Sequence, residues 1–104
     1  MLEKAIQVIR EVLERHGVHP LRFYLFGSRA RGDHRPDSDW DIYVVVDREL
    51  AHADRRLIVT EIKRALAPLR IPNDVVLKSA ERFDALKDYP GSLVYDVVRE
   101  GVAL

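Results

Sequence analysis

The sequence predicts an α/β (α+β) fold in which helices cover a small mixed sheet of three or more strands. Apolar residues recur at helical spacing in segments 2–16 and 48–67, and short runs rich in β-branched and aromatic residues lie between and after them. Three strands alone do not fix which pairs run parallel. The 104 residues fit a single domain, 1–104, with one modest core.

The first half of the chain is expected to contain one long helix and two strands. Residues 2–16 place apolar side chains on one helical face, and Gly17 ends that helix. The run LRFYLF, residues 21–26, follows Pro20 and is typical of a strand. The β-branched run WDIYVVVD, residues 40–47, is a second and stronger strand signal.

The second half is expected to contain a long helix, a strand and two short helices. The helical spacing of residues 48–67 is broken by Pro68. The run IPNDVVLKS, residues 71–79, predicts a third strand with a proline near its start, where proline is tolerated. Ser92 is a suitable N-cap for the last helix. The two short helices are expected at residues 80–88 and 92–100.

The composition argues against several classes of protein. Lys and Arg number 17, as do Asp and Glu, and the resulting net charge of +0 argues against a general nucleic-acid binder. The chain has no cysteine, so it has neither a disulfide framework nor a thiolate metal site, which fits a cytoplasmic location. No apolar run approaches about 18 residues, so no membrane-spanning helix is expected.

Two aspartates, Asp39 and Asp41, stand at the start of the second predicted strand. Residues two apart in a strand face the same side, so their carboxylates project together, whereas Trp40 and Ile42 face the core. Adjacent carboxylates raise each other's pKa unless a cation lies between them. Hard oxygen ligands select magnesium or manganese, so the pair points to a divalent metal site. The alternative for Asp39 is a turn residue.

A third acid, Asp74, lies inside the third predicted strand. Strand propensity and desolvation both disfavour an aspartate there, which suggests a specific role. If the second and third strands are neighbours, Asp74 lies beside Asp39 and Asp41 on one face. Two metal ions about 4 Å apart would then activate an attacking oxygen and neutralise a leaving phosphate. The alternative is a turn acid that follows Pro72.

The segment FGSRARG follows the first predicted strand directly. Gly27 allows a sharp turn and a close approach of the backbone to a ligand, and a helix that begins at Ser28 directs free N–H groups at an anion. The alternative is a plain strand-to-helix turn with an N-cap serine. Arg29 and Arg31 either neutralise a triphosphate or pair with nearby aspartates. Gly32 is expected to end the short helix.

At the C-terminal end, apolar side chains are dense. They either cover the sheet, which a core of this size favours, or form an exposed patch for pairing with another protein. The residues concerned are Leu93, Val94, Val97, Val98, Val102 and Leu104.

One pattern in the sequence resembles that of the nucleotidyltransferase superfamily that includes DNA polymerase β. It consists of Gly27-Ser28, ten further residues, Asp39-x-Asp41 and a later strand aspartate, Asp74. The length of the chain and the segment LFGSRARG…SDWDIYVVV are similar to those of its smallest members, the minimal nucleotidyltransferases or MNT domains. The resemblance covers nearly the whole chain, and the combined spacing is more specific than either short motif alone.

The resemblance implies a nucleotidyltransferase that uses two magnesium ions, or manganese, and takes ATP as its substrate. A hydroxyl would attack the α-phosphate in line and release pyrophosphate, a reaction that depends on positioning and charge neutralisation. Asp74 would lie on the side of the incoming hydroxyl. The implied nucleotide-binding residues are Gly27, Ser28 and Arg29, and the implied catalytic and metal-binding residues are Asp39, Asp41 and Asp74.

MNT proteins are commonly the antitoxin half of a two-gene module whose other half is a HEPN-domain RNase toxin. The resemblance therefore implies a type VII-like antitoxin, a protein adenylyltransferase that transfers AMP to a tyrosine of the toxin and forms a complex with it, as part of a homo- or hetero-oligomer. No direct contact with nucleic acid or membrane is expected. The alternatives are a non-catalytic antitoxin that occludes the toxin, which the three aspartates disfavour, and a stand-alone small-molecule nucleotidyltransferase, which the short length disfavours.

Overall fold

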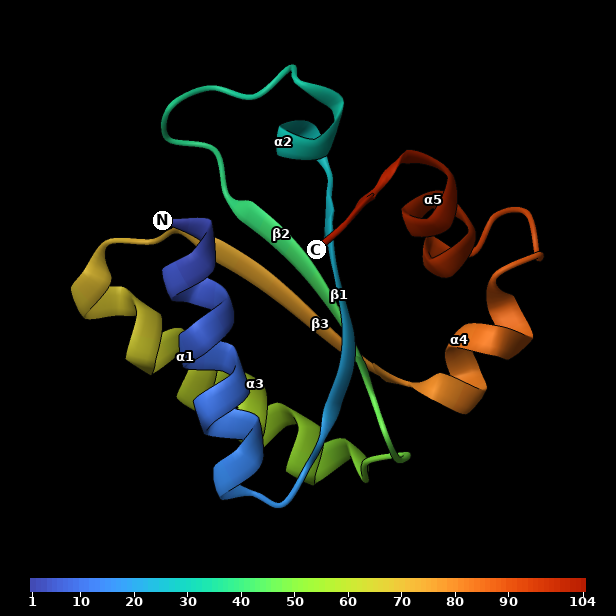
Figure 1. Cartoon of the computed structure of the whole chain (residues 1–104), viewed down its shortest axis with the longest axis horizontal. Helices are drawn as coiled ribbons and strands as arrows, with labels where there is room; N and C mark the ends of the chain where they lie inside the picture. The colour runs from blue at the N-terminus through green and yellow to red at the C-terminus, as the bar shows by residue number, and fades with distance from the viewer.

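The computed structural model describes all 104 residues and contains a four-stranded mixed sheet with helices on both faces (Figure 1). The strand order is β3-β2-β1-β4. β1 and β2 are antiparallel, β2 and β3 are parallel, and β4 pairs antiparallel with β1. The predicted fold class is confirmed. The strands are β1 (Pro20–Phe26), β2 (Trp40–Val46), β3 (Asn73–Ser79) and β4 (Val102–Ala103).

Two helices lie on each face of the sheet, and a fifth, short helix lies at one end of it (Figure 1). α1 and α3 pack on one face, and α4 and α5 pack on the other. No helix is both long and apolar enough to cross a bilayer. The helices are α1 (Leu2–Arg15), α2 (Ser28–Arg31), α3 (His52–Leu66), α4 (Ala80–Leu86) and α5 (Leu93–Glu100), and a 3₁₀ turn, η1 (Ala67–Leu69), follows α3.

β2 is buried on both sides because it lies inside the sheet between two helical layers. Ile42, Val44 and Val46 enter the larger core beneath α1 and α3, as predicted. Tyr43 and Val45 enter a smaller core beneath α4 and α5. The alternation of β2 side chains therefore defines two cores, and it places Asp41 on the α4–α5 side.

The helix predicted over 48–67 begins later, at His52, with Ala51 as its N-cap. The residues before it form a connection in which the Glu49 carboxylate accepts a hydrogen bond from the Ser79 hydroxyl at 2.7 Å. This bond ties the connection to the end of β3, so the apolar spacing that extended the prediction to residue 48 does not describe a helix there.

The apolar residues of the C-terminal segment partly cover the sheet and partly remain exposed, so each of the two interpretations holds in part. Val94 and Val97 are buried against the sheet, as the favoured interpretation requires. Leu93, Val98 and Leu104 remain exposed. β4 was not predicted, because two residues are too few to show an alternating pattern.

Tyr43 provides a test of packing in the smaller core. Its ring is fully buried, its hydroxyl has no hydrogen-bond partner, and burial raises its pKa to about 12. An unsatisfied buried hydroxyl costs about 1–3 kcal/mol. We therefore expect Tyr43→Phe to raise the free energy of unfolding, measured by urea denaturation, and Tyr24→Phe, at a partly exposed ring, to leave it nearly unchanged. A less stable Tyr43→Phe variant would contradict this packing.

Candidate active site

The three predicted carboxylates lie at one end of the sheet. Asp41 and Asp74 are direct partners across the parallel pair β2–β3. Partners in register point their side chains to the same face, and Asp39 precedes Asp41 by two residues. The condition on which the prediction depended, that the second and third strands are neighbours, is therefore met.

The electrostatics of Asp41 show that these carboxylates repel one another. Burial raises the pKa of Asp41 above its usual value, and the negative charges of Asp74 and Asp39 raise it further. The nearby Arg31 guanidinium opposes this shift. Asp39 and Asp74 are exposed, so the site opens to solvent and to a ligand.

The donor chemistry of this group fits a hard divalent cation, because it consists of carboxylate oxygens of like charge on one face. No group of three or more His, Cys, Asp or Glu side chains is already arranged to hold a metal ion in the structure. The roles of Asp39, Asp41 and Asp74 as metal ligands therefore stay a prediction, supported by the register and by their mutual repulsion.

Gly27 joins β1 to α2 and packs directly against Asp41. Its backbone angles, φ 73° and ψ −156°, lie in a region that is essentially restricted to glycine. A Cβ at this position would overlap Oδ2 of Asp41 and lie 2.9 Å from its Cγ. Two independent constraints, the backbone conformation and the lack of space for a Cβ, therefore require glycine here. Glycine allows the turn to lie directly against the Asp41 carboxylate.

The short helix α2 begins at Ser28 and ends at Gly32, as predicted. Gly32 is left-handed, with φ 86°, and its N–H donates to the Ser28 carbonyl at 2.9 Å. The N–H groups of Ser28 and Arg29 lie in the first turn and have no acceptor within the helix. These groups are available to an anion beside Gly27, and phosphate binding by this turn stays a prediction.

Arg29 holds the loop that leads from α2 to β2. Its guanidinium donates to the carbonyl of Ser38 at 2.9 and 3.1 Å and to the carbonyl of Pro36 at 3.1 Å. It also lies over the Trp40 ring, 4.0 Å from the centroid. The nucleotide-binding role of Arg29 stays a prediction, and the structure adds a role in ordering the loop that carries Asp39.

The role of Arg29 in the loop predicts the effect of Arg29→Lys. Lysine keeps the charge but cannot make the planar, forked set of contacts. We expect faster amide hydrogen exchange in the loop, residues 33–39, with β1 unchanged. Arg31→Lys is the matched control, because Arg31 contacts this loop through a surface ion pair with Asp33, at 3.4 Å, and not through the loop carbonyls. Equal exchange in the wild type and the Arg29 variant would contradict this role.

A cavity of about 240 Å³ opens beside the Gly27 turn, between α2 and α5. From the sequence alone, α5 was not expected at this site. The spacing of its residues could have indicated a shared surface. The residues spaced to lie on one helical face are Leu93, Asp96, Val97 and Glu100. The lining residues are Phe26, Gly27, Arg31, Leu93, Asp96, Val97 and Glu100.

The fold and this end of its sheet define a nucleotidyltransferase type of domain. The family model described as Polymerase beta, Nucleotidyltransferase matches residues 7–104, so the chain belongs to that family. The resemblance drawn from the Gly-Ser turn and the aspartates is therefore confirmed. Compared with curated proteins, the chain matches none significantly.

Solved structures with the same fold come from toxin–antitoxin complexes. A mutant of the toxin–antitoxin MntA-HpeT is 22% identical with a TM-score of 0.62, covering 97% of this chain and 69% of that one. A toxin-antitoxin structure with AMP-PNP is 23% identical with a TM-score of 0.58, covering 93% and 69%. A tri-AMPylated Shewanella oneidensis HEPN toxin in complex with MNT antitoxin is 22% identical with a TM-score of 0.57, covering 97% and 66%.

Proposed function

We propose that this chain is a magnesium-dependent protein adenylyltransferase that acts as a type VII-like antitoxin, with residues 1–104 forming one catalytic domain. It transfers AMP from ATP to a tyrosine hydroxyl of a partner HEPN RNase toxin and binds that toxin. The observation that carries the proposal is the pairing of Asp41 with Asp74 across β2 and β3, directly beside the Gly27 turn.

The similar solved structures support the same chemistry. One toxin–antitoxin structure contains AMP-PNP, and another contains a tri-AMPylated HEPN toxin with its MNT antitoxin. The MntA-HpeT mutant carries glutamate substitutions at two aspartates spaced as Asp39 and Asp41 are here. AMP transfer is therefore the most specific reaction compatible with the family, the site and these relatives.

The roles of the chain's own residues follow from their positions. Asp39, Asp41 and Asp74 would hold magnesium, and bound magnesium supplies charge neutralisation for the phosphates and activation of the attacking hydroxyl. The backbone N–H groups of the Gly27–Ser28 turn would bind the β- and γ-phosphates. The tyrosine oxygen bonds to the α-phosphorus, the bond to the bridging oxygen of the β-phosphate breaks, and pyrophosphate leaves. Asp74 faces the incoming hydroxyl and accepts its proton.

Catalysis is favoured over simple occlusion of the toxin because the cluster of three carboxylates lowers the stability of the fold. Burial and the charges of two neighbouring acids disfavour the ionised form of Asp41, and a surface used only for binding gains nothing from that arrangement. A small-molecule acceptor stays the other alternative. The proposed use of ATP fits the cytoplasmic location expected from the sequence.

Intact-mass measurement tests the proposal. The chain is incubated with its HEPN partner, ATP and magnesium chloride, and the partner is weighed by mass spectrometry with and without EDTA. We expect a gain of one or more AMP units on a partner tyrosine, lost with EDTA. An inhibited partner of unchanged mass, in a stable complex, would instead establish the occluding antitoxin and overturn the proposed transfer.

A further inference from the structure

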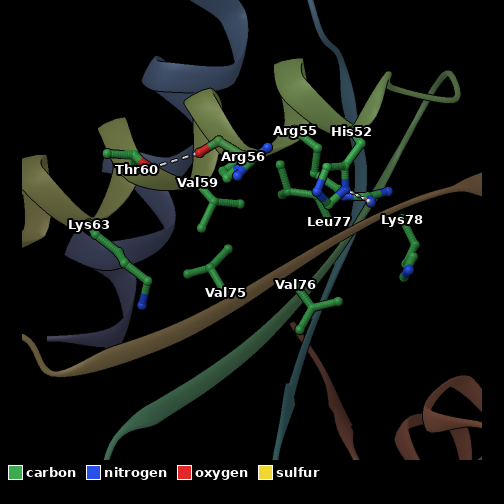
Figure 2. Close-up of a pocket in the computed structure, with 10 residues that line it drawn as sticks. All are labelled: His52, Arg55, Arg56, Val59, Thr60, Lys63, Val75, Val76, Leu77 and Lys78. Atoms are coloured by element: carbon green, nitrogen blue, oxygen red, sulfur yellow. Dashed lines mark hydrogen bonds between the residues drawn. The ribbon is translucent and has the colours of Figure 1, made fainter.

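A groove of about 330 Å³ runs between α3 and β3, the outermost strand of the sheet (Figure 2). None of Asp39, Asp41 and Asp74 lines this groove, so its lining is distinct from the candidate active site, although Asp74 directly precedes Val75 in β3. The lining residues are His52, Arg55, Arg56, Val59, Thr60 and Lys63 of α3, and Val75, Val76, Leu77 and Lys78 of β3.

The charge of this groove is entirely positive. Arg55, Arg56, Lys63 and Lys78 line it, and no carboxylate does. The acid that influences Lys78 is Glu49, whose carboxylate already accepts the Ser79 hydroxyl. In a chain with a net charge of +0, four cations without carboxylates between them make a local surface that favours an acidic partner.

The edge of β3 also offers backbone hydrogen-bonding groups. β3 is the outermost strand, with β2 as its one neighbour in the sheet. The Trp40 N–H donates to the Pro72 carbonyl, and backbone groups alternate along a strand, so those of Val75 and Leu77 point outward. Lys63 covers part of this edge, since its ammonium donates to the Asn73 carbonyl at 3.2 Å.

We propose that this groove binds an acidic, extended segment of a partner protein, which joins the sheet as an additional strand beside β3. Outward backbone groups of Val75 and Leu77 would pair with the segment, a recognised mode of peptide binding at open sheet edges. Acidic side chains of the segment would meet the four cations. Val59 on the α3 face and Val76 on the opposite face of the sheet would contact its alternate side chains.

Two other occupants are disfavoured by the same residues. A second copy of this chain would bring an equally basic edge against this one, and like charges in an interface are repulsive. Single-stranded nucleic acid is held largely by stacking on aromatic side chains, and Tyr, Phe and Trp are absent from the lining. An acidic peptide satisfies both the charges and the backbone edge. This inference does not depend on the proposed AMP transfer.

The test uses the full chain, labelled with ¹⁵N, and a defined peptide probe. The probe is a capped peptide of seven residues, the length of β3, in which glutamate alternates with threonine. Three matched probes accompany it: the same peptide with lysine for glutamate, the same peptide N-methylated at alternate residues, and an oligouridylate. N-methylation removes backbone donors on one edge while keeping the charge, so it separates strand pairing from simple attraction.

We expect saturable shifts of the Val75 and Leu77 amide signals with the acidic peptide and slower hydrogen exchange at both. Neither the lysine nor the N-methylated peptide should bind comparably. The double variant Arg56→Gln/Lys63→Gln should bind about tenfold more weakly, because two exposed ion pairs of up to about 1 kcal/mol each account for at most about thirtyfold. The control Lys4→Gln/Arg64→Gln removes the same charge outside the groove and should bind normally.

Three results would overturn the proposal. Equal binding of the N-methylated peptide would show attraction without strand pairing. Shifts centred on another element would show that the groove is not the site. Binding of the oligouridylate in place of the peptide would assign the surface to nucleic acid. Each result is independent of AMP transfer, because no carboxylate of the candidate active site is altered.

Discussion

Asp41→Asn is expected to abolish AMP transfer and, at the same time, to stabilise the fold. Asp41 is the central carboxylate, paired with Asp74 in register and placed against Gly27. Replacing it by a neutral amide would weaken the binding of the metal ion that neutralises the phosphates, and we expect a loss of about a thousandfold in rate. Asp37→Asn, which changes an exposed acid in the loop after α2, should retain full activity.

The gain in stability follows from the pKa of Asp41. Burial and the charges of Asp74 and Asp39 raise this pKa in the folded state above 3.8. The folded state therefore binds more protons than the unfolded state between 3.8 and the raised value, and stability falls as the pH rises through that window. At neutral pH the cost of the ionised carboxylate persists, and asparagine removes it.

Denaturation curves measured over a range of pH test whether the ionised Asp41 carboxylate lowers the stability of the fold. The difference in free energy of unfolding between Asp41→Asn and the wild type should be positive at pH 7 and vanish well below the unfolded-state pKa. Asp47→Asn is a control with the opposite expected sign. A hydrogen bond from the His19 N–H lowers the pKa of Asp47, so the loss of this carboxylate should destabilise the fold. An active or less stable Asp41→Asn variant would contradict the account.

Gly27→Ala is expected to be the most damaging single methyl addition to the turn. The conformation of Gly27 costs other residues about 1–3 kcal/mol, and the new Cβ would also overlap the Asp41 carboxylate. Gly32→Ala is the matched control: Gly32 also has a positive φ, of 86°, but a Cβ there would meet nothing within 4 Å. We expect Gly32→Ala to cost about 1–2 kcal/mol from backbone strain alone and to leave transfer largely intact.

A double-mutant cycle isolates the contact between the turn and the carboxylate. Asp41→Ala removes the group that the new Cβ would strike, so Gly27→Ala should be less destabilising in that background than in the wild type. Urea denaturation of the four proteins gives the coupling energy. Additive losses would mean that backbone strain explains the whole effect and that Gly27 does not fix the position of Asp41.

Local sequence patterns predicted most of the elements and the direction of the key side chains. The alternation in β2 correctly placed Ile42 and Val44 in a core and Asp41 on the opposite face. The Ser28 start and the Gly32 end of α2 followed from helix-capping preferences. These features depend on neighbours close in the chain, which is why one sequence sufficed.

Features that depend on distant pairing could not be predicted. The position of Asp74 beside Asp41 required β2 and β3 to be adjacent, which strand propensity does not specify. Arg29 binds the Pro36 and Ser38 carbonyls in the structure. The sequence alone did not distinguish this role from a contact with phosphate. The basic groove at β3 could be recognised only once that strand was known to form the edge of the sheet.

We propose that Asp39, Asp41 and Asp74 together hold a divalent metal ion beside the Gly27 turn. Titration of the ¹⁵N-labelled chain with Mn²⁺ in the presence of AMP-PNP tests this directly, because bound Mn²⁺ broadens the signals of nearby amides. We expect broadening to begin at residues 27–28, 39–41 and 74 and to be lost in Asp41→Asn. Broadening centred on another group of acids, or unchanged in that variant, would contradict it.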